Sequence, residues 1–258
     1  MQQVSVVLAT HNEAANLARC LDAVTAFANE IIIADGASTD DTVAIARRYK
    51  AQIIATTNKA NFHINKQMAI DAARGDLILQ LDADEVVDEE LASFIKQLAA
   101  QPDAEIAAWW IRRRNFFCGR FLRKGGQYPD PVIRLFYRGR AQLPQKDVHE
   151  QMQVAGKTAT AAGHLLHYGN PTFAAYYRKF HTYTHFKALQ LQEQGRPRLL
   201  QAARHLLWLP LQTFLLIYLR HKGFVDSWQG LVFALFSGLH HPVAYLKYLR
   251  LSYAKNLS

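Results

Sequence analysis

The chain has 258 residues, of which 50% are hydrophobic, and it carries 30 Lys and Arg against 21 Asp and Glu. This length and composition predict a folded protein with a substantial core, one domain plus an appendage. The two cysteines, Cys20 and Cys118, exclude a disulfide framework and favour a reducing compartment. The amino terminus does not show the pattern of a secretory signal peptide, which is a basic segment followed by an apolar segment and a cleavage site. We therefore expect no secretion.

The charge differs strongly between the two parts of the chain. Residues 1–100 hold 8 Lys and Arg and 14 Asp and Glu, whereas residues 101–258 hold 22 and 7. A basic second part predicts an anionic partner, which is a nucleic acid, a membrane surface or a phosphorylated substrate.

Strand and helix patterns alternate over the first hundred residues. Continuous apolar runs predict strands over 4–9, 30–34, 52–55 and 77–81. Apolar spacing of three and four, with capping residues and glycines at the ends, predicts helices over 13–26, 41–49, 64–73 and 91–100. This order predicts the α/β class, with a Rossmann-like, mostly parallel sheet flanked by helices.

The pattern changes after residue 100. Strands are predicted over 107–112 and 132–136, and an irregular loop rich in Gly, aromatic and basic residues over 115–131. From residue 173 the pattern is helical, with predicted helices over 173–194, 199–219, 224–239 and 245–253.

Polar loops follow the predicted strands at one edge of the sheet. The carboxyl ends of parallel strands meet in the crevice where open α/β sheets bind ligands. The loop residues with suitable side chains are Thr10, Asn12, Glu13, Asp35, Asp82 and Asp84. The Asp35-Gly36 pair alone is also typical of a simple turn.

Asp82 and Asp84 end the apolar run of the last predicted strand. At positions i and i+2 they project to one face, where two carboxylates repel. A divalent cation carrying a diphosphate removes this repulsion, since Mg²⁺ commonly takes one or two carboxylates and phosphate oxygens. Lys66 is expected to pair with a phosphate or with Asp82. The alternative is a surface loop with acidic residues that start a helix.

Three segments resemble the family 2 glycosyltransferases, which have the GT-A fold: VSVVLATHNE at 4–13, EIIIADGASTDDT at 30–42 and LDADE at 81–85. Three others resemble the branch with bacterial lipopolysaccharide core glucosyltransferases: GGQYPD at 125–130, RLF at 134–136 and VHE at 148–150. The similarity covers residues 4–185 well and the carboxyl-terminal helices loosely.

The resemblance implies a role for each matching residue. The uracil and ribose of a UDP-sugar fall against Thr10, Asn12, Glu13 and Asp35, with Lys66 and Asp82 completing the predicted donor site. Asp82 and Asp84 match the family's DXD motif, in which the last acid binds Mg²⁺ or Mn²⁺ and the first contacts ribose or metal.

The resemblance also implies inversion at the anomeric carbon by direct displacement, which needs one carboxylate base. The family's usual Glu-Asp pair is replaced here by His149-Glu150, so the base must be inferred. We predict Glu150, with Asp147 and Asp130 as the next candidates. The alternative for Glu150 is a surface ion pair with a nearby cation such as Arg134 or Lys146.

The acceptor is expected to contact Tyr128, Asp130, Arg134 and His149. Residues 119–130 are interpreted as a lid or acceptor wall, and an ordinary surface loop is the alternative. The basic runs 112–114 and 120–124 are expected to bind phosphorylated acceptor or lipid headgroups, unless they form a solvated face. His181 and His185 have the spacing of a helical metal pair, but a packed or membrane-facing helix is favoured because a third ligand is not evident.

The last sixty residues mix apolar runs with cations, Trp and Tyr, as amphipathic helices in a membrane interface do. We expect peripheral attachment to the anionic inner face of the cytoplasmic membrane, with a possible homo-oligomer. A helical cap or a dimer interface is the alternative. A spanning helix over 199–219 is not expected, because Arg204 falls within it.

The sequence therefore predicts a GT-A domain over 1–172 and a helical membrane-associating or oligomerising region over 173–258. Within the first, 1–100 form the nucleotide-binding half and 101–172 the acceptor half. The expected activity is metal-dependent, inverting transfer of a hexose, glucose by preference, from a UDP-sugar to a lipid-linked glycan such as the lipopolysaccharide inner core.

Two alternatives stay open. One is transfer to a polyprenyl phosphate, which two spanning carboxyl-terminal helices would favour. The other is a basic nucleic-acid-binding module, which the acidic first part and the lack of a nucleic-acid motif oppose, so no nucleic-acid partner is expected.

Overall fold

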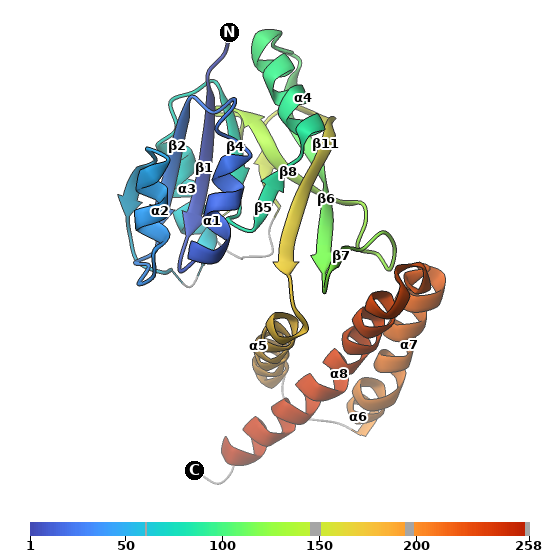
Figure 1. The fold of residues 1–258 in the computed structure, drawn as a ribbon. Coiled ribbons are helices and arrows are strands. Elements are labelled where there is room, and N and C mark those ends of the chain that lie inside the picture. Colours follow the sequence, from blue (N-terminus) through green and yellow to red (C-terminus); the bar gives the residue numbers. More distant parts are fainter. Residues whose placement is uncertain (60, 145–150, 194–198, 256–258) are drawn as a thin grey trace. The chain divides into compact units, whose positions relative to one another are not determined.

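The computed structural model describes residues 1–59, 61–144, 151–193 and 199–255. The chain divides into two compact units (Figure 1). The sheet unit comprises Met1–Arg113 and Asp130–His167, and the helical unit comprises Arg114–Pro129 and Tyr168–Ser258. The predicted boundary between 172 and 173 lies near the second division, whereas the segment 114–129 groups with the carboxyl-terminal helices.

The first half of the sheet is parallel, as the alternation of strands and helices predicts. Its strands are β1 (Val4–Thr10), β2 (Glu30–Asp35), β3 (Gln52–Ala55) and β4 (Leu77–Leu81). They lie in the order β3-β2-β1-β4, each parallel to its neighbour.

Antiparallel strands complete the sheet. They are β5 (Glu85–Val87), β6 (Ile106–Phe117), β7 (Arg120–Phe121), β8 (Asp130–Tyr137) and β11 (Lys157–Asn170). The order continues β4-β8-β6-β11-β5, and β7 pairs with the end of β6. A separate ribbon pairs β9 (Ala141–Gln142) with β10 (Gln153–Val154). This mixed sheet is the α/β fold with helices around it that the sequence predicts.

Helices cover both faces of the parallel half, because β1 alternates its side chains between two cores. Val6 and Leu8 pack into a core with α1 (Ala14–Asp22), α2 (Thr42–Arg48) and α4 (Glu89–Ala100). Val7 packs on the other face, in a core with α3 (Phe62–Asp71). All residues of β4 are buried, as expected for a strand covered on both faces.

Two parts of the predicted elements were wrong. The segment 115–131 is partly strand, because β6 extends to Phe117 and β7 pairs with it. Strand β11 was not predicted, since its Thr, Ala, Gly and His residues weaken the apolar alternation that signals a strand.

The helical unit is built around α8 (Ser227–Lys255), which continues through Pro242 and so joins the two helices predicted over 224–239 and 245–253. Helix α5 (Phe173–Glu193) packs against α8 through aromatic rings, such as Phe180 on Phe236 at 5.3 Å between centroids. These contacts offset the helix hydrogen bond that a proline cannot donate.

A continuous helix precedes α8 and packs along it. It comprises α6 (Leu199–Ala203), a π-helical turn at Arg204–Trp208, α7 (Leu209–Leu215) and a second π-helical turn at Leu216–Arg220. A Cβ on Gly238 of α8 would lie 2.7 Å from the Pro210 carbonyl oxygen, so glycine permits this close approach.

Residues Gln201–Arg220 of this helix are long and apolar enough to cross a membrane, with a mean hydropathy of 1.2. The sequence-based expectation that this segment does not span a membrane stays a prediction, and Arg204 lies within the segment. Length and composition are the only criteria met, and a soluble core helix can meet them too. None of these residues is buried within the chain.

Gly163 in β11 permits the contact between this strand and the start of α4. Its φ is +83°, and a Cβ there would lie 2.2 Å from the Leu91 nitrogen. We expect Gly163→Ala to lower the free energy of unfolding by about 3 kcal/mol, because strain and overpacking add. Gly139→Ala is the matched control, since Gly139 has φ +76° but open space around it, and should cost about 1 kcal/mol. Urea denaturation measures both, and equal losses would contradict the packing argument.

Candidate functional site

The carboxyl ends of the parallel strands bring the predicted loop residues to one edge of the sheet. Thr10 at the end of β1 is in register with Asp35 at the end of β2, and the Thr10 Oγ1 hydroxyl donates to Asp35 Oδ1 at 3.1 Å. On the other side of β1, Leu8 is in register with Leu81, after which Asp82 leaves β4. Thr10, Asp35 and Asp82 thus follow three adjacent strands.

Asp35 orders the loop that follows β2. Its carboxylate accepts from the backbone N–H of Ser38 at 2.9 Å and from the Ser38 hydroxyl at 2.6 Å, and the side chain is almost fully buried. Ionised carboxylates have about four acceptor positions, so these bonds and that from Thr10 leave capacity for a base N–H.

Asn12 and Glu13 link the loop after β1 to the start of α2. The Asn12 N–H donates to the Ser38 hydroxyl at 2.9 Å, and its Oδ1 accepts from the Thr39 N–H at 2.8 Å. The Glu13 N–H donates to Thr42 Oγ1 at 2.8 Å. These bonds fix the two loops that carry the predicted uracil and ribose contacts.

Asp82 lies in a cluster of buried charges. Lys66 of α3 pairs with Asp82 Oδ1, which is one of the two roles predicted for this lysine. The Arg134 guanidinium of β8 donates to Asp82 Oδ2 at 2.5 Å, to Glu85 Oε1 at 3.2 Å and also to Gln80. The predicted acceptor residue Arg134 is therefore placed beside the metal motif.

These neighbours decide the protonation of Asp82. Burial opposes its charge, but the charges of Arg134 and Lys66 outweigh burial and hold the pKa of Asp82 well below its usual range. Burial lowers the pKa of Lys66, which Asp82 partly offsets. For Arg134, burial is outweighed by Asp82 and Glu85, which raise the pKa of the guanidinium.

Arg113 extends the cluster towards β8. Its guanidinium lies 3.3 Å from Glu85 Oε1 and donates to Asp130 Oδ2 at 2.6 Å. Burial would lower the pKa of Arg113, but Glu85 and Asp130 raise it. Asp130, a predicted acceptor residue and a candidate base, is thus held by a cation of the basic run 112–114, whose expected partners were phosphorylated acceptor or lipid headgroups.

Asp84 has a different partner from Asp82. Its Oδ2 lies 3.4 Å from Nε2 of His167, which the pairing of β11 with β5 places opposite Glu85. Carboxylate oxygen suits Mg²⁺ and Mn²⁺, imidazole nitrogen is a common ligand of divalent transition metals, and both side chains are partly accessible. His167 was missed because β11 was not predicted, and strand pairing over long sequence distance is what brings it here.

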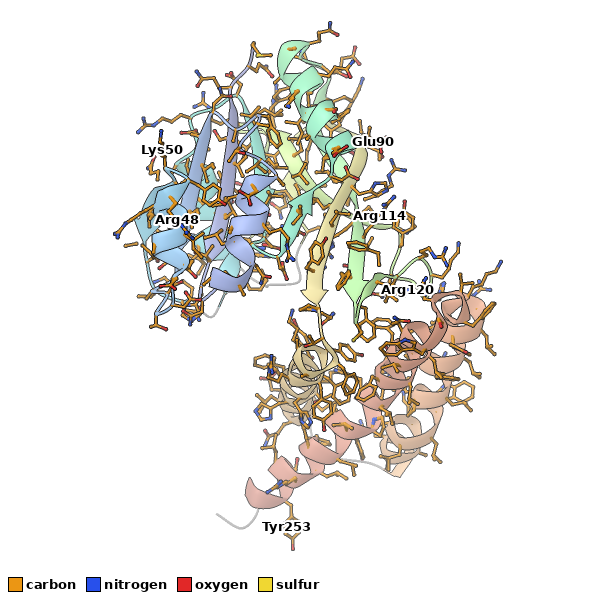
Figure 2. All side chains as sticks on the ribbon, in the orientation of Figure 1. Arg48, Lys50, Glu90, Arg114, Arg120 and Tyr253 are labelled. Carbon is orange, nitrogen blue, oxygen red and sulfur yellow. The ribbon has the colours of Figure 1, made fainter. Side chains whose placement is uncertain are left out.

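A second group of metal-ligating types lies at the start of α4, formed by Asp88, Glu90 and His164 (Glu90 is labelled in Figure 2). Asp88 caps the helix by accepting from Leu91 N–H at 2.9 Å, and it accepts from the backbone and ring of His164 at 3.0 and 3.1 Å. Both carboxylate oxygens therefore have structural roles. His164 and His167 are three residues apart on one strand and so face opposite sides of the sheet.

Of the remaining acceptor-side predictions, the structure describes Tyr128. Tyr128 belongs to the helical unit. The predicted base Glu150, its neighbour His149 and the second candidate Asp147 lie outside the described residues.

The model of the family "Glycosyl transferase family 2" matches residues 5–181 of the chain. The lipopolysaccharide core biosynthesis glycosyltransferase LpsC of Rhizobium meliloti is 31% identical over 247 residues, covering 86% of this chain and 86% of LpsC. An uncharacterized glycosyltransferase of Rickettsia typhi, RT0209, is 25% identical over 272 residues. The match covers 100% of this chain and 88% of RT0209.

Among solved structures, the mannosyltransferase PcManGT from Pyrobaculum calidifontis, in complex with GDP-Man and Mn²⁺, superposes with a TM-score of 0.55 at 14% identity. The match covers 96% of this chain and 87% of PcManGT, which shows a shared fold. The fold is thus that of the GT-A glycosyltransferases, as the sequence predicts. The chain belongs to glycosyl transferase family 2.

The low pKa of Asp82 makes stability depend on pH. In the unfolded chain Asp82 takes up a proton near pH 4, whereas in the folded chain it stays ionised, so its contribution is present above pH 4 and is lost as the pH falls. The free energy of unfolding of the wild type falls between pH 5 and pH 3, partly because of Asp82. We expect this fall to be smaller in Asp82→Asn, by up to about 1 kcal/mol. Urea denaturation at each pH measures this, and parallel profiles would contradict it.

Proposed function

We propose that this glycosyltransferase is metal-dependent and inverting, and transfers a hexose from a UDP-sugar to a hydroxyl of a lipid-linked glycan. Within this proposal, glucose is the sugar that we favour and the lipopolysaccharide inner core is the acceptor that we favour. The observation that carries the proposal is the pair Asp82 and Asp84 at the end of β4, with Asp82 neutralised by two cations and Asp84 facing His167.

The donor end of the site supports a nucleotide ligand. Thr10 and Asp35 are joined by a hydrogen bond, and Asn12 and Glu13 are fixed by backbone bonds, so the two loops present a preformed edge. Preformed polar groups at the carboxyl ends of parallel strands are the usual ligand-binding position in open α/β sheets.

Asp84 and His167 are the residues that would hold the cation. They offer one carboxylate and one imidazole within 3.4 Å of each other, which is a suitable donor set. A bound divalent cation neutralises a diphosphate as a Lewis acid and orients it. Asp82 contributes in another way, because its ion pairs with Lys66 and Arg134 fix the strand end from which Asp84 projects.

Inversion requires the acceptor hydroxyl to approach opposite the leaving group and to lose its proton as the new bond forms. A positioned carboxylate supplies this general base, typically worth 10²- to 10⁴-fold in rate. We propose Glu150, which comes from a different chain segment from Asp84 and so need not compete for the metal. Asp130 is a weaker candidate because Arg113 already binds its carboxylate.

The lipopolysaccharide acceptor is proposed from LpsC, whose name states a role in lipopolysaccharide core biosynthesis and which covers most of this chain. Such an acceptor places the reaction at the cytoplasmic face of the membrane. Transfer to a polyprenyl phosphate is a second candidate, favoured by the span-length helix Gln201–Arg220. Radiolabelled transfer to purified core acceptors and to polyprenyl phosphate in parallel separates the two.

We expect Asp84→Ala and His167→Ala each to weaken Mn²⁺-supported UDP binding at least tenfold, since each removes a metal ligand. Isothermal titration calorimetry with UDP, with and without Mn²⁺, measures the effect. His164→Ala is the matched control, because it removes a histidine of the same strand from the other acidic group. If Mn²⁺-supported UDP binding is lost in His164→Ala and kept in His167→Ala, the metal site would have to be assigned to the start of α4.

Glu150→Gln should leave UDP binding unchanged and lower the rate of transfer by at least 10²-fold, because the amide cannot accept the hydroxyl proton. Asp147→Asn and Asp130→Asn are the matched controls among the other candidate bases. Radiolabelled sugar transfer gives the rate, and calorimetry checks the donor site. Full activity of Glu150→Gln, with collapse in one of the controls, would assign the base to that residue.

A further inference from the structure

The helical unit carries almost all of the excess positive charge. Its two segments, 114–129 and 168–258, contain 15 Lys and Arg but only 2 Asp and Glu, whereas the sheet unit contains 15 and 19. One of the two acids, Asp226, is fully buried and accepts from the backbone N–H groups of Arg123 and Lys124 at 2.8 to 3.0 Å. The solvent-facing surface of this unit is therefore strongly cationic.

The same unit exposes a continuous apolar stripe. Leu207, Leu211, Leu215 and Leu219 follow one another at intervals of four along the helix Gln201–Arg220, so they lie on one side of it. Leu207 is 72% exposed and Leu211 is 55% exposed. Beyond the turn the apolar side chains of Phe224 and Trp228 are also exposed. Soluble proteins rarely leave such a surface in water, so it indicates a binding partner.

Cations lie at the turn where the apolar stripe passes from one helix to the next. Arg220 and Lys222 are exposed in the turn itself. The loop residue Arg123 is tied to the turn through Asp226 and is also exposed. The Gly125 N–H donates to the His221 carbonyl at 2.9 Å, which fixes the loop to the turn a second time. Exposed cations therefore lie in a turn and a bonded loop next to the exposed leucines of the helix.

We propose that this surface, called the interfacial stripe and formed by Leu207, Leu211, Leu215, Leu219, Phe224 and Trp228 with the flanking cations, docks on an anionic lipid bilayer. The inference deepens the proposed function and rests on it, because a lipid-linked acceptor lies in such a bilayer. Leu and Trp side chains enter the acyl boundary while Lys and Arg pair with anionic headgroups.

The charge of the unit favours a bilayer over a second copy of the chain. Two copies meeting through this surface would bring two cationic units together, which costs free energy, whereas anionic headgroups neutralise them. The polar contacts favour a helix pair that lies on the bilayer. Thr213 and His241 are 3.0 Å apart between α7 and α8, and crossing would carry the charged turn and its tied loop through the hydrocarbon.

Sedimentation of the full chain with vesicles tests the proposal. We expect binding to phosphatidylcholine vesicles containing phosphatidylglycerol, a loss of at least tenfold in affinity without phosphatidylglycerol, and a decrease with salt. The double variant Leu207→Glu/Leu211→Glu should bind at least tenfold more weakly. Leu189→Glu is the matched control, because Leu189 is an exposed leucine of α5 outside the stripe, and it should bind as wild type.

Three further measurements separate the outcomes. Circular dichroism must show that the double variant is folded. Tryptophan fluorescence of the wild type should be quenched by brominated lipid, and Trp228→Phe should reduce this quenching, since Trp228 belongs to the stripe. Release by alkaline carbonate supports docking, and retention in the pellet would overturn it in favour of a spanning helix. A dimer that the double variant dissociates, without lipid binding by the wild type, would overturn it in favour of self-association.

The proposed lipid docking and the proposed catalytic site can be disproved independently of each other. Asp84→Ala should lose UDP binding and keep vesicle binding, whereas Leu207→Glu/Leu211→Glu should lose vesicle binding and keep UDP binding. Unchanged vesicle binding by the double variant would overturn the stripe and leave the transferase assignment intact.

Discussion

The neutralisation of Asp82 is the interaction on which the site depends. Asp82, Asp84 and Glu85 follow one another at the end of a buried strand, and charges of like sign this close repel by several kcal/mol where water is excluded. Lys66 comes from α3 and Arg134 from β8, so two separate elements supply the cations that stabilise the Asp82 anion. The site is therefore a consequence of the finished sheet rather than of the acidic motif alone.

The same need for neutralisation explains why basic and acidic side chains alternate across the sheet. Arg134 lies between Asp82 and Glu85, and Arg113 lies between Glu85 and Asp130. Each guanidinium contacts two carboxylates, so removing one cation weakens the compensation of two acids at once. A buried ion pair of this kind contributes little net stability when intact, but it is costly to break. Its effect is to fix geometry, and here the group whose position it fixes is Asp84.

The sequence predicts the parallel half of the fold because its signals are local. Continuous apolar runs, helix spacing and capping residues lie within a few residues of one another, and β1 to β4 appear where those signals are. The antiparallel half depends on pairing between distant segments. His167 meets Asp84 only because β11 pairs with β5, and Arg134 meets Asp82 only because β8 pairs with β4. Sequence motifs therefore identify the acidic residues. They do not identify the residues that strand pairing places beside these acids.

Arg134 illustrates the limit of motif reasoning. Its position in the segment RLF links it to the acceptor by resemblance, yet the register of β8 places its side chain among Gln80, Asp82 and Glu85. The predicted helix break at residues 240–244 was wrong for a similar reason, because packing of α8 against α5 compensates for Pro242. In both cases a tertiary contact overrides a local signal.

The separation of charge between the two units has a physical rationale in the proposed function. A metal site needs acids that outnumber their local cations, since otherwise no negative charge is left to attract the ion. A surface for anionic headgroups needs the opposite balance. Within one mixed surface the two sets would neutralise each other, and both sites would be weak. The chain keeps 19 of its 21 acids in the sheet unit, and it buries Asp226 of the helical unit beneath Arg120 and Arg123, where this acid orders the basic loop instead of cancelling its charge.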